Sequence, residues 1–426
     1  MTSRSIQFGL LAAALPVLAT QAGAQDVEEF YKGRTVTLMV SAGAGGGYDA
    51  YARTVARHIG RHIPGNPNII VQNRPGAGGL VMANFMYNAA PKDGSVFGAI
   101  HRNMATDPLI GEKGDRIKYD AMKFHWLGSA NSEVSICASR ADSPVKTFQD
   151  AIDHPLILGA EPNTDIEQFP IVMNNLIGTK FKIVTGYPSG TGVNLAVERG
   201  EVQGRCGWSW SSFKSQKMKW VKDGFAHVFV QISLKKHPDL PDTPLVMDYV
   251  KDKDTIAALK LVFSRQEFGR PYFAPPGLPK ERAAALRSAF WKTMKDDDFV
   301  KDIEKQKLEL NPMNGDDLQA LIEDLYKSPK NVVEAAIRAT HPQTKLDKAK
   351  IKMVTHKGPI MEVLKGGRTI VFEHHGEKMK AGISGSQTNV VVGGKKAKRS
   401  AIKVGMNCSV TYPGPGQRAK TVECGM

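Results

Sequence analysis

The sequence lacks the short motifs that most often mark catalytic centres. It contains no Gly-x-Ser-x-Gly turn, no His-Glu-x-x-His helix and no Cys-x-x-Cys pair, so the usual signatures of serine hydrolases, zinc proteases and thiol redox enzymes are missing. The one adjacent histidine pair is His374-His375. In a strand these side chains would face opposite ways, which argues against a metal site. The sequence therefore offers no motif for these enzyme classes, and a metal site at the histidine pair is disfavoured.

Long apolar runs are also scarce. Residues 1–24 contain one basic side chain near the start, an uncharged apolar segment from Ile6 to Ala19 and the small residues Ala22-Gly-Ala24, which together predict a cleaved secretory signal peptide. The alternative, a membrane anchor, is less favoured because the apolar segment is shorter than the roughly 20 residues that a span requires. No later segment is apolar enough to span a bilayer, so we expect an exported mature chain.

Cysteine is rare, with four residues in 426, but export permits disulfides. Cys408 and Cys424 flank the turn Pro413-Gly-Pro-Gly416, so they would face each other near the open end of a hairpin, and we expect them to form a disulfide. Cys137 and Cys206 each lie at the end of a predicted strand. They either pair with each other or remain two buried thiols.

The net charge of +15 is unevenly distributed. Residues 341–426 contain 16 Lys and Arg against 5 acidic residues, a balance of +11, which leaves +4 for the rest of the chain. We expect a linker at 340–349, and the strand patterns with Gly and Pro turns in 350–426 predict a small basic antiparallel β-barrel. The basic run Lys395–Arg399 is interpreted as a solvated turn, with a patch for nucleic acid, anionic polysaccharide or a membrane surface as the alternative. We expect no nucleic-acid partner.

Glycine is abundant where the first strand turns into the first helix. The apolar, β-branched run 35–41 predicts a buried parallel strand and 48–62 has helical period, with four glycines between positions 43 and 47. Such a turn leaves backbone N–H groups and the positive end of the helix dipole unobstructed, so it predicts an anion site. Asp49 is expected to accept N–H bonds as a cap and to orient the glycine loop.

A second strand, glycine-rich loop and helix follow directly. The strand is predicted at 68–72 and the loop at 73–79, and a third strand at 95–100 ends in His101 and Arg102. Because the carboxyl ends of parallel strands meet at one edge of a sheet, one small anion could touch both loops. His101 and Arg102 point at the same edge, where they are either solvated or in contact with the ligand.

A dinucleotide-binding loop is the main alternative for the first glycine turn. With Gly43 and Gly45 as the first pair of a Gly-x-Gly-x-x-Gly motif, the sixth position is Tyr48. The second strand ends in Gln72-Asn-Arg74, which offers no carboxylate for a ribose. These departures disfavour a nucleotide site.

The middle of the chain repeats the alternation of strands, polar loops and helices. Glycine-rich or polar loops follow predicted strands at 156–158 and 182–185, so both α/β units would present helix N-termini to a shared cleft, with a hinge in the paired connections. The predicted domains are a signal peptide at 1–24, lobe I at 25–128 and 234–339, lobe II at 129–233, a linker at 340–349 and the β-barrel at 350–426.

Several motifs resemble those of the Bug-type solute receptors of tripartite tricarboxylate transporters. They are Ala-Gly-Gly-Gly-Tyr-Asp within 36–53, Gln72–Gly79, Ala90-Pro-Lys-Asp-Gly94, Gly186–Gly190 and Glu198–Val202. The likeness covers roughly residues 30–340, and the two glycine loops at this spacing are its most specific part. The resemblance implies a type II periplasmic binding protein, in which two hinged α/β lobes close over a small carboxylate in the periplasm and deliver it to a membrane permease. We expect a monomer that is not an enzyme, and binding should need neither a metal nor an organic cofactor, because oriented backbone amides hold the anion.

The resemblance also places ligand contacts on both lobes. Tyr48 stands where the family commonly has Ser or Thr, while Arg205 and Trp208 replace a commoner acidic or apolar ending. Arg205 would add a charge partner and Trp208 a stacking face, so both departures bear on the usual dicarboxylate preference. The predicted ligand-binding residues are Gly46, Gly47, Tyr48, Asp49, Arg74, Gly76, Ala77, Gly78, His101, Asn163, Thr164, Tyr187, Ser189, Gly190, Arg205 and Trp208.

The alternative function is a ligand-sensing or envelope-attached binding protein that is not coupled to transport. It would use the basic C-terminal domain to bind a polyanion or a protein partner.

Overall fold

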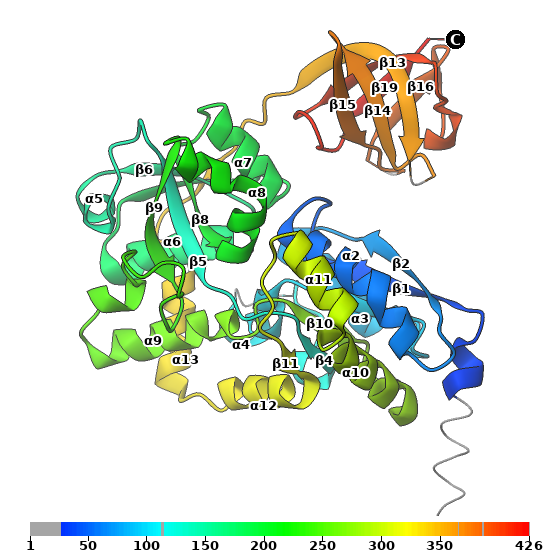
Figure 1. The fold of residues 1–426 in the computed structure, drawn as a ribbon. Coiled ribbons are helices and arrows are strands. Elements are labelled where there is room, and N and C mark those ends of the chain that lie inside the picture. The colour runs from blue at the N-terminus through cyan, green and yellow to red at the C-terminus, as the bar shows by residue number, and fades with distance from the viewer. Residues whose placement is uncertain (1–26, 112–114, 365, 386, 426) are drawn as a thin grey trace, which may run out of the picture.

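The computed structural model describes residues 27–111, 115–364, 366–385 and 387–425. They form two α/β lobes and a third, all-β domain at the C-terminal end (Figure 1). The predicted signal peptide lies outside the described residues. Among the helices that the structure describes, none has the length and apolarity that a membrane crossing needs.

Lobe I is built on a six-stranded mixed sheet. Its strands are β1 (Thr35–Val40), β2 (Asn68–Asn73), β3 (Val96–Ala99), β4 (His125–Ser129), β10 (Pro271–Ala274) and β11 (Met313–Asn314). Their order is β11-β4-β10-β3-β1-β2. The first strand pairs in parallel with β2 and β3, which confirms the parallel arrangement predicted from the alternation of strands and helices, whereas β10 and β11 run antiparallel to their neighbours.

Helices cover this sheet with the faces that their sequence period predicts. They are α2 (Gly47–Ile59), α3 (Leu80–Asn88), α10 (Lys280–Met294), α11 (Asp297–Lys305) and α12 (Gly315–Tyr326). The short helix α4 (Asp107–Ile110) packs toward lobe II instead, where Ile110 is buried in that lobe's apolar cluster. Tyr51, Val55 and Ile59 of α2 are fully buried, because they recur at helical spacing on the side that faces the sheet. The glycine turn before α2 thereby lies at the carboxyl end of β1.

Lobe II repeats this architecture around a second six-stranded sheet. Its strands are β5 (Ser135–Arg140), β6 (Leu156–Ala160), β7 (Phe181–Thr185), β8 (Gly204–Ser209), β9 (Ala226–Ile232) and β12 (Asp347–Lys348), in the order β12-β7-β6-β8-β5-β9. Its helices are α5 (Phe148–Asp153), α6 (Asp165–Ile177), α7 (Gly190–Glu198) and α8 (Trp210–Lys222). The middle strands β6, β7 and β8 are parallel, so the starts of α6 and α7 lie at one edge.

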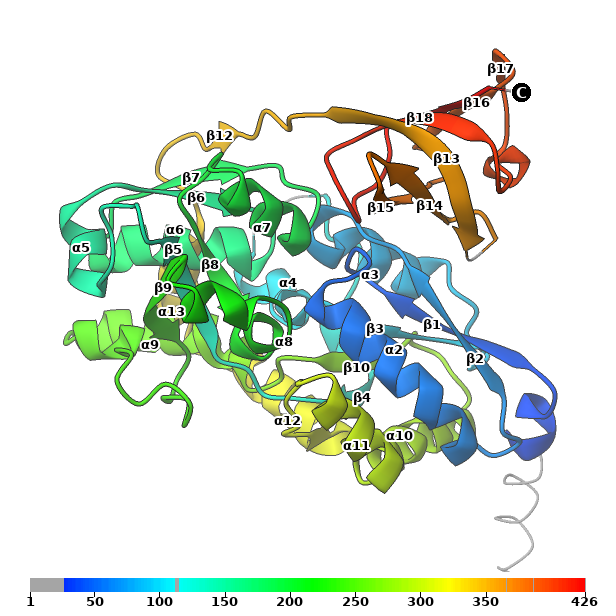
Figure 2. The ribbon, with the colours of Figure 1, turned by 45° about the horizontal axis from the view of Figure 1, so that its top comes forward.

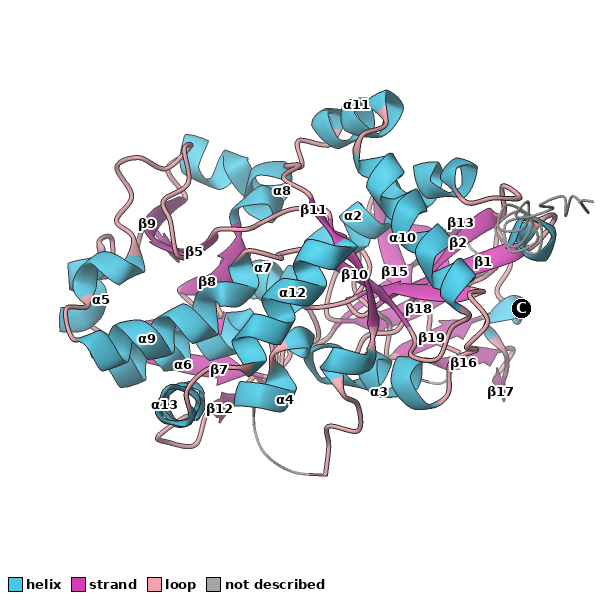
Figure 3. Cartoon of the chain, turned by 90° about the horizontal axis from the view of Figure 1, so that it is seen from below, coloured by secondary structure: helices cyan, strands magenta, loops and turns pink. Residues whose placement is uncertain are grey.

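Two later helices pack in lobe II although the sequence division placed them in lobe I. These are α9 (Lys253–Phe263) and α13 (Lys330–Thr340). Leu259, Phe263 and Ala336 are buried in one apolar cluster with Leu158 and Phe169 of lobe II. Seen from below, α9 and α13 lie beside α6, whereas α10 lies beside α2 (Figure 3). The chain therefore passes between the lobes after β4, before β10 and between α12 and α13, and we propose a lobe boundary at these three crossings.

The C-terminal segment is all-β, but its sheet is open. The strands are β13 (Val354–Leu364), β14 (Thr369–His374), β15 (Glu377–Gly382), β16 (Asn389–Val392), β17 (Lys395–Lys396), β18 (Asn407–Tyr412) and β19 (Thr421–Cys424). Their order is β15-β14-β13-β18-β19-β16-β17. The edge strands β15 and β17 do not pair with each other in the described residues, so the predicted barrel closure is not confirmed. The short, exposed Lys395 and Lys396 of β17 leave little backbone to complete a barrel.

The linker is attached to lobe II. Asp347 and Lys348 of β12 pair in parallel with Val184 and Thr185 of β7, and Figure 2 shows the chain leading from β12 along the top of this lobe into β13. The expected linker thus adds an edge strand to lobe II and restrains the β domain near α7.

Both pairs of cysteines form disulfides. Cys137 and Cys206 join β5 to β8 inside lobe II, and Cys408 and Cys424 join β18 to β19 in the β domain. The second pair is confirmed as the sequence predicted it. For the first pair, the structure decides between the two alternatives in favour of a bond.

Candidate functional site

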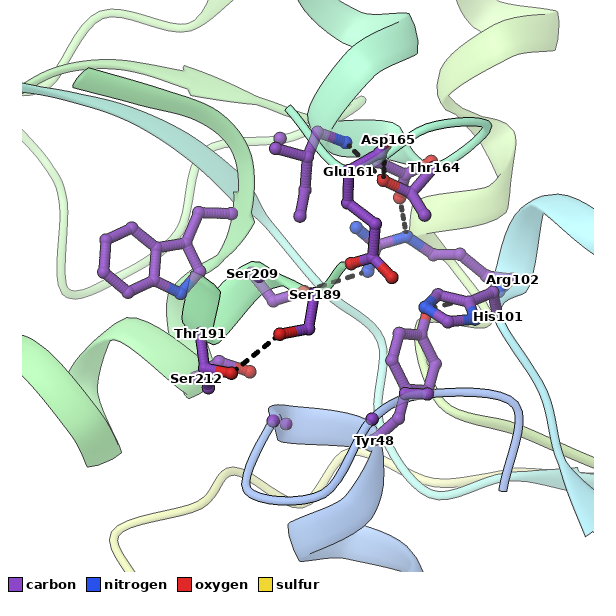
Figure 4. Close-up of a pocket in the computed structure, with 18 of the residues that line it drawn as sticks. Tyr48, His101, Arg102, Glu161, Thr164, Asp165, Ser189, Thr191, Ser209 and Ser212 are labelled. Carbon is purple, nitrogen blue, oxygen red and sulfur yellow. Dashed lines mark hydrogen bonds and ion pairs between the residues drawn. The ribbon is translucent and has the colours of Figure 1, made fainter. Parts of the chain in front are cut away.

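A pocket lies between the two lobes at the carboxyl edges of their sheets (Figure 4). It encloses about 630 Å³ of empty space, a figure that includes the part that opens to solvent. Its walls come from the glycine turn of lobe I and from the starts of α6, α7 and α8 in lobe II. The lining residues are Ala42, Gly43, Gly46, Gly47, Tyr48, His101, Arg102, Asn103, Glu161, Thr164, Asp165, Ile166, Ser189, Gly190, Thr191, Arg205, Gly207, Trp208, Ser209, Ser212, Gln216 and Arg270.

The lobe I wall contains the uncapped N-terminus of α2. Gly46 is the N-cap residue, and no side chain accepts a hydrogen bond from the first turn in its place. The first N–H groups of a helix have no partner within the helix, and the helix dipole adds positive potential at the same point. Gly46, Gly47 and Tyr48 all line the pocket, so this wall can hold an anion.

Asp49 holds the glycine loop in place but does not line the pocket. Its Oδ2 accepts the backbone N–H of Gly45 at 2.9 Å and the Nε–H of Arg53 at 2.9 Å. Its Oδ1 accepts from Asn73 Nδ2, 2.8 Å away on the second loop. This is the orienting role predicted for Asp49, and the aspartate also ties the two loops together.

The second loop lies beside the first but does not line the pocket. Arg74 stacks on Phe85 with its guanidinium carbon 3.8 Å from the ring centroid. Gly76, Ala77 and Gly78 have positive φ angles of 147°, 46° and 62°, a conformation that glycine adopts most readily. None of these four residues is in the pocket wall.

The glycines of this second loop serve a contact between the lobes. A Cβ atom placed on Gly78 would lie 2.0 Å from the carbonyl oxygen of Asn163 in lobe II, so only glycine allows the approach. Asn103 donates from Nδ2 to the same carbonyl at 3.0 Å. Asn163 is therefore a partner of lobe I. The sequence showed a backbone that could be approached closely, but it could not distinguish a ligand from the opposite lobe.

Arg102 crosses the cleft from lobe I. Its Nε lies 2.5 Å from Oδ2 of Asp165 at the start of α6, and its other nitrogens donate to Ser209 and Ser135 of lobe II. The carboxylate of Asp165 also faces Arg265, with 3.0 Å between the closest atoms. Arg102 is therefore engaged with side chains of the opposite lobe, so it joins the lobes more than it attracts an anion.

His101 lines the pocket in its neutral form. Burial lowers its pKa to about 4, and Ser41 Oγ lies 2.8 Å from Nδ1. Its ring also lies against Tyr48, with the centroids 4.5 Å apart, and the Tyr48 hydroxyl accepts the N–H of Arg102. His101 can therefore supply a neutral hydrogen-bonding group.

The lobe II wall is lined by two helix starts that carry their own caps. Thr164 caps α6 by accepting from Ile166 N–H, and Ser189 caps α7 by accepting from Gly192 N–H. Gly190 also lines the pocket. Tyr187, in contrast, is buried in the core of lobe II and does not belong to the wall.

Arg205 and Trp208 form one unit in this wall. The Arg205 guanidinium lies over the Trp208 ring, 4.3 Å from its centroid. Its Nη1 donates to the carbonyl of Gly190 at 3.0 Å and to Oδ1 of Asn194 at 2.6 Å. The stacking face expected of Trp208 is thus occupied by Arg205.

Three acidic residues and one arginine in or near the pocket were not predicted as site residues: Asp165, described above, Glu161, Glu133 and Arg270. Glu161 follows β6 and lines the pocket. Arg270, before β10, pairs with the fully buried carboxylate of Glu133 at 2.8 Å and donates to Ser212 of α8 at 2.9 Å. No local motif marks these residues, because Arg270 and Glu133 come from separate lobe crossings.

A group outside the pocket has the composition of a cation site. His237, Asp239 and Glu309 place their ligand atoms within 4.8 Å of one another. Lys214 Nζ already lies between the two carboxylates, 2.5 Å from Asp239 and 3.0 Å from Glu309. The ammonium group occupies the position that an ion would take, so this group is a contact between the lobes.

Parts of this chain resemble known proteins. No family model matches the chain. A UPF0065 protein from the TAR-I ttuE-ttuC' intergenic region of Agrobacterium vitis is 29% identical over 162 residues, and one from the gbd 5' region of Cupriavidus necator is 32% identical over 142 residues. These matches cover 36% and 33% of this chain and about two fifths of the length of the relatives, 41% and 40%.

Solved structures match over more of the chain. The periplasmic binding protein BugD has a TM-score of 0.58 and 19% identity, over 75% of this chain and 100% of that one. Rpa4515 of R. palustris, solved with adipate, has a TM-score of 0.56, 17% identity and coverage of 71% and 97%. MatC from Rhodopseudomonas palustris, solved with malate, has a TM-score of 0.55, 18% identity and coverage of 72% and 99%.

The two lobes and the pocket between them define the fold of a periplasmic binding protein. The curated relatives and the structural neighbours together confirm the resemblance to the Bug-type periplasmic binding proteins of tripartite tricarboxylate transporters that the two glycine loops indicated. The structural matches cover 71% to 75% of this chain, so about a quarter of it or more lies outside each match.

Proposed function

We propose that this protein is a periplasmic solute receptor that binds a small carboxylate between its lobes and delivers it to a tripartite tricarboxylate-type membrane permease. The observation that supports this most directly is the uncapped start of α2 at the pocket wall. One ligand carboxylate accepts the N–H groups of Gly46, Gly47 and Tyr48, and closure of the lobes excludes water and strengthens these hydrogen bonds.

The two neighbours solved with adipate and malate support a carboxylate as the ligand class. Binding of this kind needs no metal, no organic cofactor and no reaction, and one chain forms the whole pocket, so we propose a monomeric receptor without enzymatic activity. The remaining polar lining, which includes Thr164, Ser189 and His101, contacts the distal part of the ligand.

Native mass spectrometry of the freshly purified protein tests this proposal. We expect a bound small acid that is released unchanged on denaturation, and an uptake assay in cells with and without the matching permease genes tests delivery. A protein that carries no acid and shows no heat of binding with any small carboxylate would contradict the receptor function. Chemical conversion of the acid would contradict the non-enzymatic part.

A second candidate is a sensor that is not coupled to transport, and one contact favours it. Gln417 of the β domain donates from Nε2 to Oγ1 of Thr191 at 3.3 Å, and Thr191 lines the pocket and lies 2.8 Å from Ser189 Oγ. The basic β domain thus touches the ligand site through α7. Removing the β domain, residues 350–426, keeps β12 on the lobe II sheet and distinguishes the candidates. Uptake survives this truncation in a transport receptor, whereas signalling or envelope attachment is lost in a sensor.

A further inference from the structure

Glu161 is the acidic side chain of the pocket that has no ion-pair partner among the described residues. The other acid in the wall, Asp165, is matched by Arg102 and Arg265. Figure 4 shows the Glu161 carboxylate pointing from the loop before α6 into the space between Ser189 and Tyr48. A ligand that enters the pocket therefore meets this carboxylate directly.

The arginines in the pocket wall do not compensate the negative charge of Glu161 when an anion enters, because each is already engaged. Arg102 is engaged with Asp165 and Arg270 with Glu133. Arg205 donates from Nη1 to Gly190 and Asn194 and stacks on Trp208, and it is the remaining cation that Glu161 faces. Each of the three arginines in the pocket wall thus already faces a carboxylate, so none of them is free to pair with a second ligand carboxylate.

The two walls of the pocket consequently differ in the charge that they favour. The lobe I wall presents helix N–H groups at Gly46 and Gly47, which suit an anion. The lobe II wall presents Glu161, which accepts hydrogen bonds and repels a carboxylate placed beside it. A ligand that spans the pocket needs opposite chemistry at its two ends.

We propose that Glu161 selects the ligand class. The pocket takes a small carboxylate with a hydrogen-bond donor at its distal end, above all an ammonium group, and binds it more tightly than an unsubstituted dicarboxylate. This inference rests on the proposed receptor function and specifies its ligand. The carboxylate of the ligand lies at the start of α2, and its donor lies against Glu161.

The test compares matched ligand pairs by isothermal titration calorimetry. Each pair differs by replacement of one carboxylate with an aminomethyl group: malonate with β-alanine, succinate with γ-aminobutyrate, and adipate with ε-aminocaproate. The alcohol γ-hydroxybutyrate provides a neutral donor. Measurements are made at about pH 8, because burial raises the pKa of Glu161 to about 7, against the opposing effect of Arg205. The wild-type protein is expected to prefer the amino compound of the best-bound pair by about tenfold or more.

The variant Glu161→Gln keeps the size of the side chain and removes its charge. We expect the preference for the amino compound to fall by about tenfold, with the affinity for γ-hydroxybutyrate changing less, because glutamine still offers an acceptor. Glu334→Gln on the exposed face of α13 removes the same charge far from the pocket and is expected to leave the preference unchanged.

The inference and the proposed function fail in different ways. A dicarboxylate preference that is equal in the wild type and in Glu161→Gln overturns the role of Glu161 while leaving carboxylate binding in place. A second result also overturns it: Glu161→Gln loses all binding, and Glu161→Asp keeps the wild-type ratio of affinities for the two members of each pair. A purely structural role of Glu161 would produce this result, because it would affect both ligands alike.

Discussion

The guanidinium of Arg102 in lobe I and the carboxylate of Asp165 in lobe II form an ion pair across the cleft, with Nε and Oδ2 2.5 Å apart. Both side chains are almost completely buried. Asp165 begins α6, directly after its cap Thr164, so the pair connects the end of β3 to the opposite sheet. The structure is thus held in a closed arrangement by the protein's own charges.

Replacing Arg102 by methionine is expected to loosen this closure. The change leaves Asp165 buried with Arg265 as its remaining partner, so we expect a loss of about 1–3 kcal/mol in the free energy of unfolding, which is less than the cost of a fully orphaned charge. Urea unfolding measures the loss, and small-angle scattering should show a larger radius of gyration without ligand.

The double variant Arg102→Met/Asp165→Asn provides the control. If the ion pair joins the lobes, the double variant should be more stable than the sum of the single changes predicts. Additive effects would show that the two side chains act independently.

The buried carboxyl of Asp107 is expected to make stability depend on pH. Burial raises the pKa of Asp107 to about 7, although Arg265 opposes the shift. Because the folded-state pKa lies above the unfolded value of about 3.9, the folded protein binds the proton more tightly, and this residue's contribution to stability declines as pH rises from about 4 through 7. Asp107→Asn should therefore raise the free energy of unfolding at about pH 8 by on the order of 1–3 kcal/mol.

The measurement is denaturant unfolding of both proteins between about pH 5 and 8. The stability difference should shrink toward acid pH, where Asp107 is protonated in the folded protein. A difference that stays constant with pH would assign the effect to packing, and a destabilised Asp107→Asn protein at every pH would contradict the expectation.

The two disulfides are expected to stabilise different parts of the molecule. Cys137–Cys206 spans 69 residues of lobe II and Cys408–Cys424 spans 16 residues of the β domain. In the chain-entropy model these loops correspond to about 4 and about 3 kcal/mol. Calorimetric scans should therefore show a lower transition temperature of the lobes in the variant without Cys137–Cys206. In the variant without Cys408–Cys424, the transition temperature of the β domain should be lower. A single shared transition in both scans would indicate that the domains unfold as one unit.

Much of lobe I could be predicted from local sequence. The apolar run at 35–41, the glycines and the helical period after them have a direct physical basis in burial and backbone freedom, and β1, the turn and α2 follow them closely. The capping role of Asp49 has the same origin, since an aspartate near a helix start accepts nearby N–H groups.

The parts that escaped prediction depend on contacts between distant segments. Gly78 looked like a ligand contact because glycine permits close approach, yet it approaches Asn163 of the other lobe. Arg270 and Glu133 meet only because two lobe crossings run side by side. In the C-terminal segment, the strand patterns do not reveal whether the sheet closes into a barrel. Such features depend on tertiary arrangement and leave no periodic signal.

The central claim is that a carboxylate binds at the start of α2 when the lobes close, and calorimetric titration of Gly47→Val tests it most directly. A Cβ atom on Gly47 would lie 3.2 Å from Cβ and 2.0 Å from Oγ of Ser212 in lobe II, whereas one on Gly46 meets nothing closer than the Gly43 carbonyl at 3.7 Å. The account predicts that Gly47→Val keeps its thermal transition but loses measurable affinity for the acid that the wild type binds, while Gly46→Ala retains it within about tenfold. Unchanged affinity in Gly47→Val would contradict the account.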